Sequence, residues 1–326
     1  MPADRNLTIE GAPVPLTPLV LGTMTFGDTV DAAAAQQVFE AALAAGITGI
    51  DTANGYAGGT TEGLIAPWVK AHRDRIVLAT KAGIPHADAG EHSPLSAAGL
   101  RASVEGSLRR LDVERIDLFY LHQPDRAASL SETLTTVAEL HAEGRIGALG
   151  ISNYAAWQAV DLLAAADAAG APRPVVAQNV YSILARRIED EWLECGRTHG
   201  VATMAYNPLA GGLLARRPSV SGAPERFTAS VLAQMYSQRY LSDTVTAACE
   251  ALADVAEGAG ISQAELALRW VAGAEGVSAL LLGASRVSQL ESNIAAVAKG
   301  PLPEDVLAAV DSATAPLRGS MPLYNR

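Results

Sequence analysis

Lysine and cysteine are both scarce in this chain of 326 residues. Lysine occurs only at Lys70, Lys81 and Lys299, among 24 lysines and arginines, so a lysine at a special position suggests a specific task. The two cysteines, Cys195 and Cys249, lie far apart. Their separation argues against a disulfide framework and fits a reducing compartment such as the cytoplasm.

Positive charge and long apolar runs are also lacking. The net charge of −11 argues against a nucleic-acid or anionic-membrane partner. Charged residues or prolines interrupt every alanine-rich stretch before the roughly 20 residues that a membrane-spanning helix needs. The first residues, MPADRNLTIEGAP, do not resemble a signal peptide. We therefore expect a cytoplasmic protein without nucleic-acid or membrane partners.

Short apolar runs and amphipathic segments alternate along the chain, and hydrophobic residues make up 49% of it. The runs are mostly continuous, as expected for strands covered on both faces of a parallel sheet. The predicted strands are Val20–Met24, Ile47–Ala53, Ile76–Gly83, Ile116–Gln123, Ile146–Asn153, Val175–Ser182, Val201–Pro208 and Val277–Ala284. Predicted helices lie between them, among them Asp31–Ala45, Ser96–Leu111, Ser131–Glu143, Tyr154–Ala169 and Arg187–His199. This α/β pattern favours a closed (β/α)8 TIM barrel over an open doubly wound sheet, as one domain spanning residues 1–326.

Two additions to the barrel are predicted. The segment NLTIEGAPVPL before the first strand indicates a β-hairpin that turns at Glu10–Gly11 and plugs the N-terminal mouth. After the seventh strand, the segment Leu209–Ser242 shows little periodicity. A segment of that length is usually functional, and this one falls on the C-terminal face, where barrel enzymes keep their active sites. We expect long loops and extra helices there.

Four chemically distinctive side chains follow three of the predicted strands. Lys81 ends the segment RIVLATKAG, Asp51 lies in ITGIDTA, and His122 lies in IDLFYLHQP. Tyr56 follows Asp51 in a glycine-rich loop. Each has an ordinary alternative role by itself, as a turn residue, a cap or a solvated side chain. Their shared placement at the C-terminal ends of barrel strands favours one catalytic site.

These residue types suit the reduction of a carbonyl, which needs a hydride at carbon and a proton at oxygen. Tyr56 is the predicted proton donor. The ordinary pKa of tyrosine, about 10, is high for this task, and the Lys81 ammonium is expected to lower it. Asp51 is expected to pair with Lys81 and keep it charged. His122 is expected to hydrogen-bond the substrate oxygen and polarise the carbonyl.

Familiar nucleotide-binding motifs are missing, because no Gly-x-Gly-x-x-Gly follows a strand and no Walker lysine occurs. Other motifs extend along most of the chain: LVLGTMTFG (19–27), GIDTANGYAGGTTE (49–62), LATKAG (78–83), DLFYLHQPD (117–125), GALGISNY (147–154), QNVYS (178–182), YNPLAGGLL (206–214) and LLGASRVSQLESN (281–293). With them the sequence resembles the aldo-keto reductases, and the last motif is similar to that of the potassium-channel β-subunits of that superfamily. The resemblance implies a barrel, a nicotinamide cofactor extended across the C-terminal face, and the tetrad Asp51, Tyr56, Lys81 and His122. Glycine follows the tyrosine in many relatives, whereas Ala57 follows it here.

The resemblance also implies the cofactor contacts. Hydroxyl and amide groups after strands five and six would hold the nicotinamide carboxamide, Tyr206 would stack on its ring, and residues after strands seven and eight would meet the phosphates. The implied set is Thr23, Met24, Asp51, Ser152, Asn153, Gln178, Tyr206, Asn207, Leu209, Gly211, Arg217, Gly283, Ser285, Arg286, Gln289 and Asn293. Arg286 is the expected partner of a 2′-phosphate, which favours NADP(H) over the alternative NAD(H). Arg217 and Arg226 are candidate phosphate clamps.

The predicted function is therefore an NADP(H)-dependent oxidoreductase that reduces the aldehyde or ketone carbonyl of a small-molecule substrate. Two alternatives stay open. One is a cofactor-binding regulatory module related to the channel β-subunits, and the other is a barrel isomerase or lyase in which Lys81 forms a Schiff base. Cys195 and His199 lack further ligands nearby, so no metal site is predicted. The identity of the substrate and the oligomeric state do not follow from the sequence.

Overall fold

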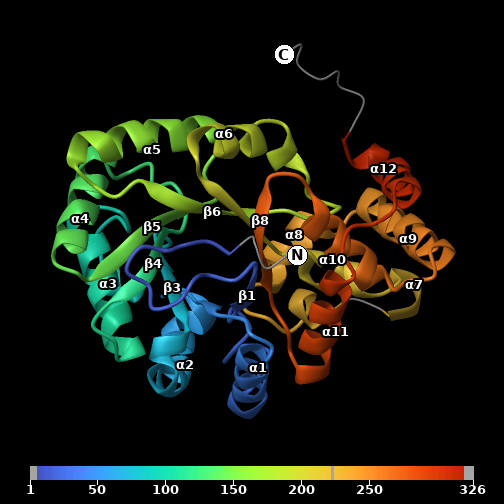
Figure 1. Cartoon of the computed structure of the whole chain (residues 1–326), viewed down its shortest axis with the longest axis horizontal. Coiled ribbons are helices and arrows are strands. Elements are labelled where there is room, and N and C mark those ends of the chain that lie inside the picture. The colour runs from blue at the N-terminus through green and yellow to red at the C-terminus, as the bar shows by residue number, and fades with distance from the viewer. Residues whose placement is uncertain (1–5, 222–223, 319–326) are drawn as a thin grey trace.

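Eight short strands pair in parallel, each with the next along the chain, and the last pairs with the first to close a barrel (Figure 1). The computed structural model describes residues 6–221 and 224–318. The strands are β1 Leu19–Gly22, β2 Gly49–Asp51, β3 Val77–Ala82, β4 Ile116–Leu121, β5 Ile146–Ser152, β6 Pro174–Val180, β7 Ala202–Tyr206 and β8 Val277–Leu282. The predicted (β/α)8 barrel is confirmed. Every strand ends earlier than predicted, because the chain turns there into the loops of the C-terminal face.

Helices cover the outside of the barrel. Those that follow the first six strands are α1 Ala32–Ala44, α2 Thr60–Ala71, α3 Ala97–Leu111, α4 Leu130–Ala142, α5 Ala156–Ala169 and α6 Trp192–His199. Short 3₁₀ segments are η2 Tyr56–Gly59, η3 Arg73–Arg75, η4 Ala87–Ala89, η5 Arg187–Glu189, η6 Ala210–Ala215 and η7 Glu225–Phe227. Asp31, Ser96 and Ser129 cap helices by accepting a backbone N–H. Gly170 and Gly200 end α5 and α6 in the left-handed conformation that glycine allows.

The N-terminal hairpin closes one mouth of the barrel. Leu7 and Leu16 exchange two backbone hydrogen bonds of 2.9 Å, and the chain turns at Glu10–Gly11, as predicted. Ile9 and Leu16 are buried against apolar side chains from the barrel strands, among them Val20, Val77, Leu118, Tyr120, Val176 and Met204. This apolar plug leaves the opposite, C-terminal end of the barrel for a functional site.

The long segment after β7 is more regular than its sequence suggests. It contains η6, α7 Pro218–Ser221, η7 and α8 Ala233–Tyr240, and α9 Asp243–Gly258 and α10 Gln263–Gly273 follow before β8. The extra helices predicted on this face are therefore confirmed, although most of those between β7 and α9 are too short to show a periodic pattern in the sequence. After β8 come α11 Val287–Ala298 and α12 Glu304–Arg318, and α12 packs beside α9 at the edge of the molecule (Figure 1). Within residues 6–221 and 224–318, no helix combines the length and the apolar character needed to cross a bilayer.

Gly150 in β5 offers a test of packing inside the barrel. A Cβ atom at this position would lie 2.5 Å from ring atoms of Tyr120, which is fully buried. We expect Gly150→Ala to lower the free energy of unfolding, measured with urea, by about 1–3 kcal/mol through overpacking. Gly63→Ala is the matched control, because nothing lies within 4 Å of its Cβ position and alanine favours the surrounding helix. Equal stabilities of the two variants would contradict this account of the barrel interior.

Candidate active site

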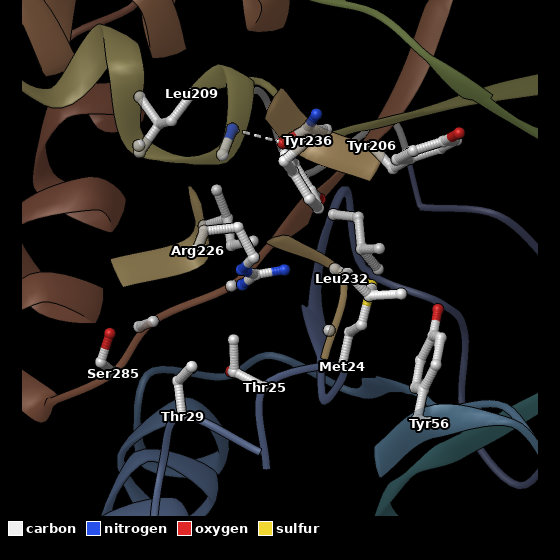
Figure 2. Close-up of a pocket in the computed structure, with 18 of the residues that line it drawn as sticks. Met24, Thr25, Thr29, Tyr56, Tyr206, Leu209, Arg226, Leu232, Tyr236 and Ser285 are labelled. Carbon is white, nitrogen blue, oxygen red and sulfur yellow. Dashed lines mark hydrogen bonds between the residues drawn. The ribbon is translucent and has the colours of Figure 1, made fainter. Parts of the chain in front are cut away.

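The C-terminal ends of β2, β3 and β4 bring the four predicted catalytic side chains together. Lys81 Nζ donates hydrogen bonds to Asp51 Oδ1, to the Thr52 carbonyl oxygen at 2.8 Å and to Tyr56 Oη at 3.0 Å. The rings of Tyr56 and His122 meet edge to face with their centroids 6.1 Å apart. Asp51 and Lys81 are fully buried, whereas Tyr56 lines a cavity (Figure 2). The buried ion pair therefore holds the Tyr56 hydroxyl from the interior of the barrel.

Lys81 is held as a fixed cation. An ammonium carries three N–H donors, and those of Lys81 are directed to Asp51, Thr52 and Tyr56. Burial lowers the pKa of Lys81, but the charges and hydrogen bonds of Asp51 and Tyr56 outweigh burial and raise it above its ordinary value. Burial also raises the pKa of Asp51, against the opposing effects of Lys81 and Gln178. A Schiff-base lysine needs a free neutral amine, so the geometry argues against a lysine-dependent isomerase or lyase.

Tyr56 is a protonated phenol at neutral pH. Burial raises its pKa, the charge and hydrogen bond of Lys81 oppose the rise, and the net shift is upward. Lys81 therefore acts on this pKa in the expected direction, but the desolvation of the ring, which the sequence could not show, outweighs it. The Lys81 Nζ lies 3.0 Å from the Tyr56 oxygen, so its charge would stabilise a phenolate at that position.

His122 carries a neutral imidazole. Burial and the charge of Lys81 lower its pKa to about 3. Its backbone is fixed from two sides: the N–H donates to the Ala82 carbonyl at 2.8 Å, and the carbonyl accepts from Asn153 Nδ2 at 3.0 Å. Nδ1 of the ring has no hydrogen-bond partner within the described part of the chain. The ring can thus orient an oxygen atom by hydrogen bonding without adding a second positive charge.

A cavity of about 1350 Å³ extends from Tyr56 and His122 to the start of α11. This volume exceeds the roughly 300–1,000 Å³ typical of small-molecule sites. Figure 2 shows Tyr56 and Ser285 toward opposite sides of the cavity, with the Arg226 side chain between them pointing inward. Most residues implied for a cofactor lie on the wall: Met24, Ser152, Asn153, Gln178, Tyr206, Asn207, Leu209, Gly211, Gly283, Ser285, Arg286, Gln289 and Asn293.

Polar side chains at the ends of β5, β6 and β7 form a hydrogen-bonded group beside the tetrad. Asn153 adopts a left-handed conformation with φ of 61° and accepts a 2.7 Å hydrogen bond from the Tyr206 hydroxyl. Gln178 Nε2 donates to Asp51 Oδ2 at 2.8 Å, and Ser152 Oγ donates to the Gln178 carbonyl at 2.8 Å. The groups implied for a nicotinamide carboxamide are therefore connected directly to the buried ion pair.

Three of the implied cofactor contacts lie off the cavity wall. Thr23 is fully buried, and its hydroxyl donates to the Asp51 backbone oxygen at 3.0 Å. The Asp51 carboxylate is itself occupied by Lys81 and Gln178. Arg217 turns to helix α9, where it forms ion pairs with Glu250, Asp254 and Glu257. The structure thus places these three residues elsewhere than on the cavity wall: Thr23 binds the backbone of Asp51, Asp51 belongs to the tetrad, and Arg217 anchors the segment after β7.

Asn207 and Gly211 serve the fold as well as the cavity wall. Gly211 has φ of 70°, and a Cβ atom there would lie 2.7 Å from the Tyr236 ring. Asn207 Oδ1 accepts from the Gly211 N–H at 2.7 Å, while its Nδ2 donates to the Tyr240 hydroxyl at 2.8 Å. The glycine is thus needed for the close packing of α8, besides leaving room for a ligand.

Sequence reasoning missed several residues that line the cavity, among them Thr25, Arg216 and Arg239. Thr25 Oγ1 is buried and has no hydrogen-bond partner among the described residues. Its place directly after the first strand, in GTMTFG, was an available signal. Arg239 gave no signal, because it lies on α8, which the sequence pattern did not predict.

The described residues offer no metal centre. Within residues 6–221 and 224–318, no three histidine, cysteine or acidic side chains gather closely enough to hold an ion. Cys195 Sγ faces the Ala156 carbonyl at 3.8 Å, and Cys249 is buried in the core between α9 and its neighbours. The surroundings of both cysteines therefore suit a role in packing.

The fold and the site together define a barrel oxidoreductase, in which a buried Asp–Lys pair supports a tyrosine and a neutral histidine at the C-terminal face. The chain belongs to the aldo/keto reductase family, whose sequence pattern matches residues 18–315. It is 34% identical to human aflatoxin B1 aldehyde reductase member 2, over 100% of this chain and 94% of that protein. It is 36% identical to human aldo-keto reductase family 7 member A3 over 94% of this chain and 96% of that protein, and 32% identical to Protein tas of Escherichia coli K12 over 90% and 93%.

The neutral state of His122 can be tested by ¹⁵N NMR of the imidazole. Since its pKa is lowered to about 3, the ring nitrogens should keep their neutral shifts as the pH falls from 8 to 5. The unfolded chain takes up the proton near pH 6.5, so His122 should make the fold less stable as the pH falls below that value. The same nuclei in urea-unfolded protein are the control. A midpoint near 6.5 in the folded protein would contradict the assignment.

Proposed function

We propose that this protein reduces aldehyde or ketone carbonyls to alcohols with NADP(H), and that Tyr56 donates the proton. One observation carries the proposal: the Tyr56 hydroxyl lies on the cavity wall, 3.0 Å from a lysine ammonium that a buried carboxylate holds in place. Relatives that are named aldehyde reductases support the same reaction.

In the proposed reaction each member of the tetrad has one task. His122 donates a hydrogen bond to the carbonyl oxygen, and Tyr56 delivers its proton to that oxygen as negative charge develops there. Lys81 stabilises the resulting phenolate, and Asp51 holds Lys81 in position. When bound, a nicotinamide cofactor would supply the hydride for the carbonyl carbon. Because the phenolate forms only as the reaction proceeds, the Lys81 charge favours the transition state over the ground state.

The residues present fit a nicotinamide dinucleotide. Thr25 Oγ1 is a buried polar atom on the wall without a partner among the described residues, and the Cβ position of Gly283 has open space around it. Both features suit a polar ligand that runs close to the backbone. Ser152 and Gln178 would hold the nicotinamide amide beside the tetrad, and Arg226 would meet the pyrophosphate.

The preference for NADP(H) over NAD(H) is proposed from Arg286. This residue is the N-cap of α11, is exposed, and lies on the cavity wall. Among the described residues, no hydrogen bond or ion pair engages its guanidinium. A helix N-terminus favours a phosphate, and a guanidinium binds phosphate oxygens in pairs. Together they would recognise the 2′-phosphate that distinguishes NADP(H).

The proposed substrate is a small-molecule carbonyl compound. Apolar side chains of Ile84, Leu232 and Met235 lie on the same cavity wall as Tyr56 and suit the apolar part of such a molecule. The net charge of −11 supports a role without nucleic-acid or anionic-membrane partners. No observation specifically favours the regulatory-module alternative.

Tyr56→Phe tests the proton donor, since it removes the hydroxyl and keeps the ring. We expect kcat for a nitrobenzaldehyde with NADPH to fall roughly 10²- to 10⁴-fold. The Kd for NADPH, measured by fluorescence titration, should stay nearly constant because the ring remains. Tyr154→Phe is the control: Tyr154 is a buried tyrosine outside the cavity wall, so its variant should keep full turnover. Normal turnover by Tyr56→Phe would exclude this residue as the donor.

Arg286→Met tests the cofactor preference. Loss of charged hydrogen bonds worth about 1.5–3 kcal/mol should raise the Kd for NADPH about 10- to 100-fold. The Kd for NADH should hardly change, because NADH has no 2′-phosphate. Arg197→Met is the control, since Arg197 pairs with Glu275 on the surface away from the cavity. An equal weakening of NADPH and NADH binding would refute the role of Arg286.

A further inference from the structure

Glu62 is a fully buried carboxylate that the proposed chemistry does not use. It lies in the first turn of α2, the helix that follows the Tyr56 loop. Its Oε1 accepts a 2.6 Å hydrogen bond from the Thr80 hydroxyl, and its Oε2 accepts a 2.9 Å hydrogen bond from Arg110 Nε. A carboxylate is unfavourable in a protein interior unless it is paired and hydrogen-bonded. Its partners therefore indicate what this charge does.

The Thr80 hydrogen bond joins the Tyr56 segment to the Lys81 strand. Thr80 precedes Lys81 in β3, and because side chains alternate along a strand, the two point to opposite faces. A closed circuit results: the Tyr56 loop leads to Glu62, Glu62 binds Thr80, Thr80 adjoins Lys81, and Lys81 binds the Tyr56 hydroxyl at 3.0 Å. The Glu62–Thr80 contact therefore constrains where Tyr56 lies relative to Lys81.

The loop after Tyr56 has a backbone conformation that the surrounding structure must hold in place. Ala57 has φ of 45°, and Gly58 and Gly59 follow with φ of 65° and 96°. The left-handed region is unfavourable for alanine and persists only where the surrounding structure enforces it. Thr61 contributes by donating from its hydroxyl to the Phe26 carbonyl at 2.8 Å. The start of α2 is thus pinned both to the chain after β1 and to β3.

Arg110 extends the connection to the far side of the loop. Its guanidinium donates two hydrogen bonds to the Asp88 carboxylate, at 2.8 and 2.7 Å. Asp88 Oδ2 lies 3.0 Å from His86 Nδ1. The His86 ring in turn lies against the end of the Tyr56 loop, since a Cβ atom on Gly59 would be 2.8 Å from His86 Nε2. The loop is therefore held through α2 on one side and through His86 on the other.

We propose that Thr80, Glu62 and Arg110 are positioning residues that fix the hydrogen bond between Tyr56 and Lys81. Without the Thr80 hydroxyl, Glu62 loses its connection to β3, and the strained loop relaxes away from Lys81. The phenolate is then less well stabilised, while the cavity walls formed by the residues after β5 to β8, where the cofactor is proposed to bind, are unchanged. The effect on turnover rests on the proposed reductase function, whereas the effect on the position of Tyr56 does not.

Thr80→Val tests the proposal, because it removes the hydroxyl at nearly constant volume. We expect kcat to fall at least tenfold, with KM and the Kd for NADPH within twofold of the original values. Thr80→Ser keeps the hydroxyl and should restore kcat. Thr314→Val is the matched control: it removes a buried threonine hydroxyl that donates to the Val310 carbonyl at 2.9 Å, far along the chain in α12. Should Thr80→Val fail to fold, Thr80→Ala makes the same test.

A second readout does not depend on turnover. In protein carrying ¹³C-labelled tyrosine, the Cζ resonance of Tyr56 is identified by its absence from Tyr56→Phe. It should move in Thr80→Val, because the hydrogen bond from Lys81 weakens, and stay in place in Thr80→Ser and Thr314→Val. If the original protein reduces no carbonyl, the proposed function fails but this resonance still tests the positioning role. An unmoved resonance, or a loss of kcat that Thr80→Ser does not repair, would overturn the proposal.

Discussion

The buried ion pair of Asp51 and Lys81 is the interaction on which the site depends. Removing two charges from water is strongly unfavourable, and such a pair is tolerated only when its remaining donors and acceptors are satisfied. Here Gln178 of β6 donates the second hydrogen bond to the Asp51 carboxylate. The Thr52 carbonyl and the Tyr56 hydroxyl accept the other two hydrogen bonds of the Lys81 ammonium. The requirement to satisfy these charges therefore fixes the ends of β2, β3 and β6 relative to one another, and with them the tyrosine.

The same ion pair sets the protonation states of its neighbours. The Lys81 charge adds to burial in lowering the pKa of His122, so that group is neutral, whereas it opposes burial at Tyr56. One cation thus keeps the histidine from becoming a second cation and prepares a place for the negative charge of a phenolate. Two groups within one electrostatic field are thus suited to different tasks in the proposed reaction, His122 as a hydrogen-bond donor and Tyr56 as an acid.

The sequence predicted the barrel and grouped the tetrad because both follow from local patterns. Short apolar runs show the strands, and barrel geometry then places Asp51, Lys81 and His122 at one face. What the sequence did not reveal depends on tertiary surroundings. The upward shift of the Tyr56 pKa arises from burial. The Arg217 side chain points to α9 because acidic side chains of that helix pair with it.

Glu62 was missed for a related reason. In the sequence it looks like the acidic residue common in the first turn of a helix, where a carboxylate favours the helix dipole and is usually solvated. Only the packing of α2 against β3 and α3 shows that it is buried and bound to Thr80 and Arg110. A local pattern identifies the type of a residue, whereas its partners come from elements far away in the chain.

The hairpin at the N-terminal mouth of the barrel limits the routes by which a proton can reach the site. Ile9 and Leu16 join an apolar layer with Val77, Tyr120 and Met204, and this layer offers few groups that relay protons. In the proposed reaction, the proton that replaces the one given up by Tyr56 would therefore arrive from the cavity side, where the product would also leave. Reprotonation of Tyr56 and release of the alcohol would then share one opening, so slow release of the product would also delay the return of Tyr56 to its protonated state.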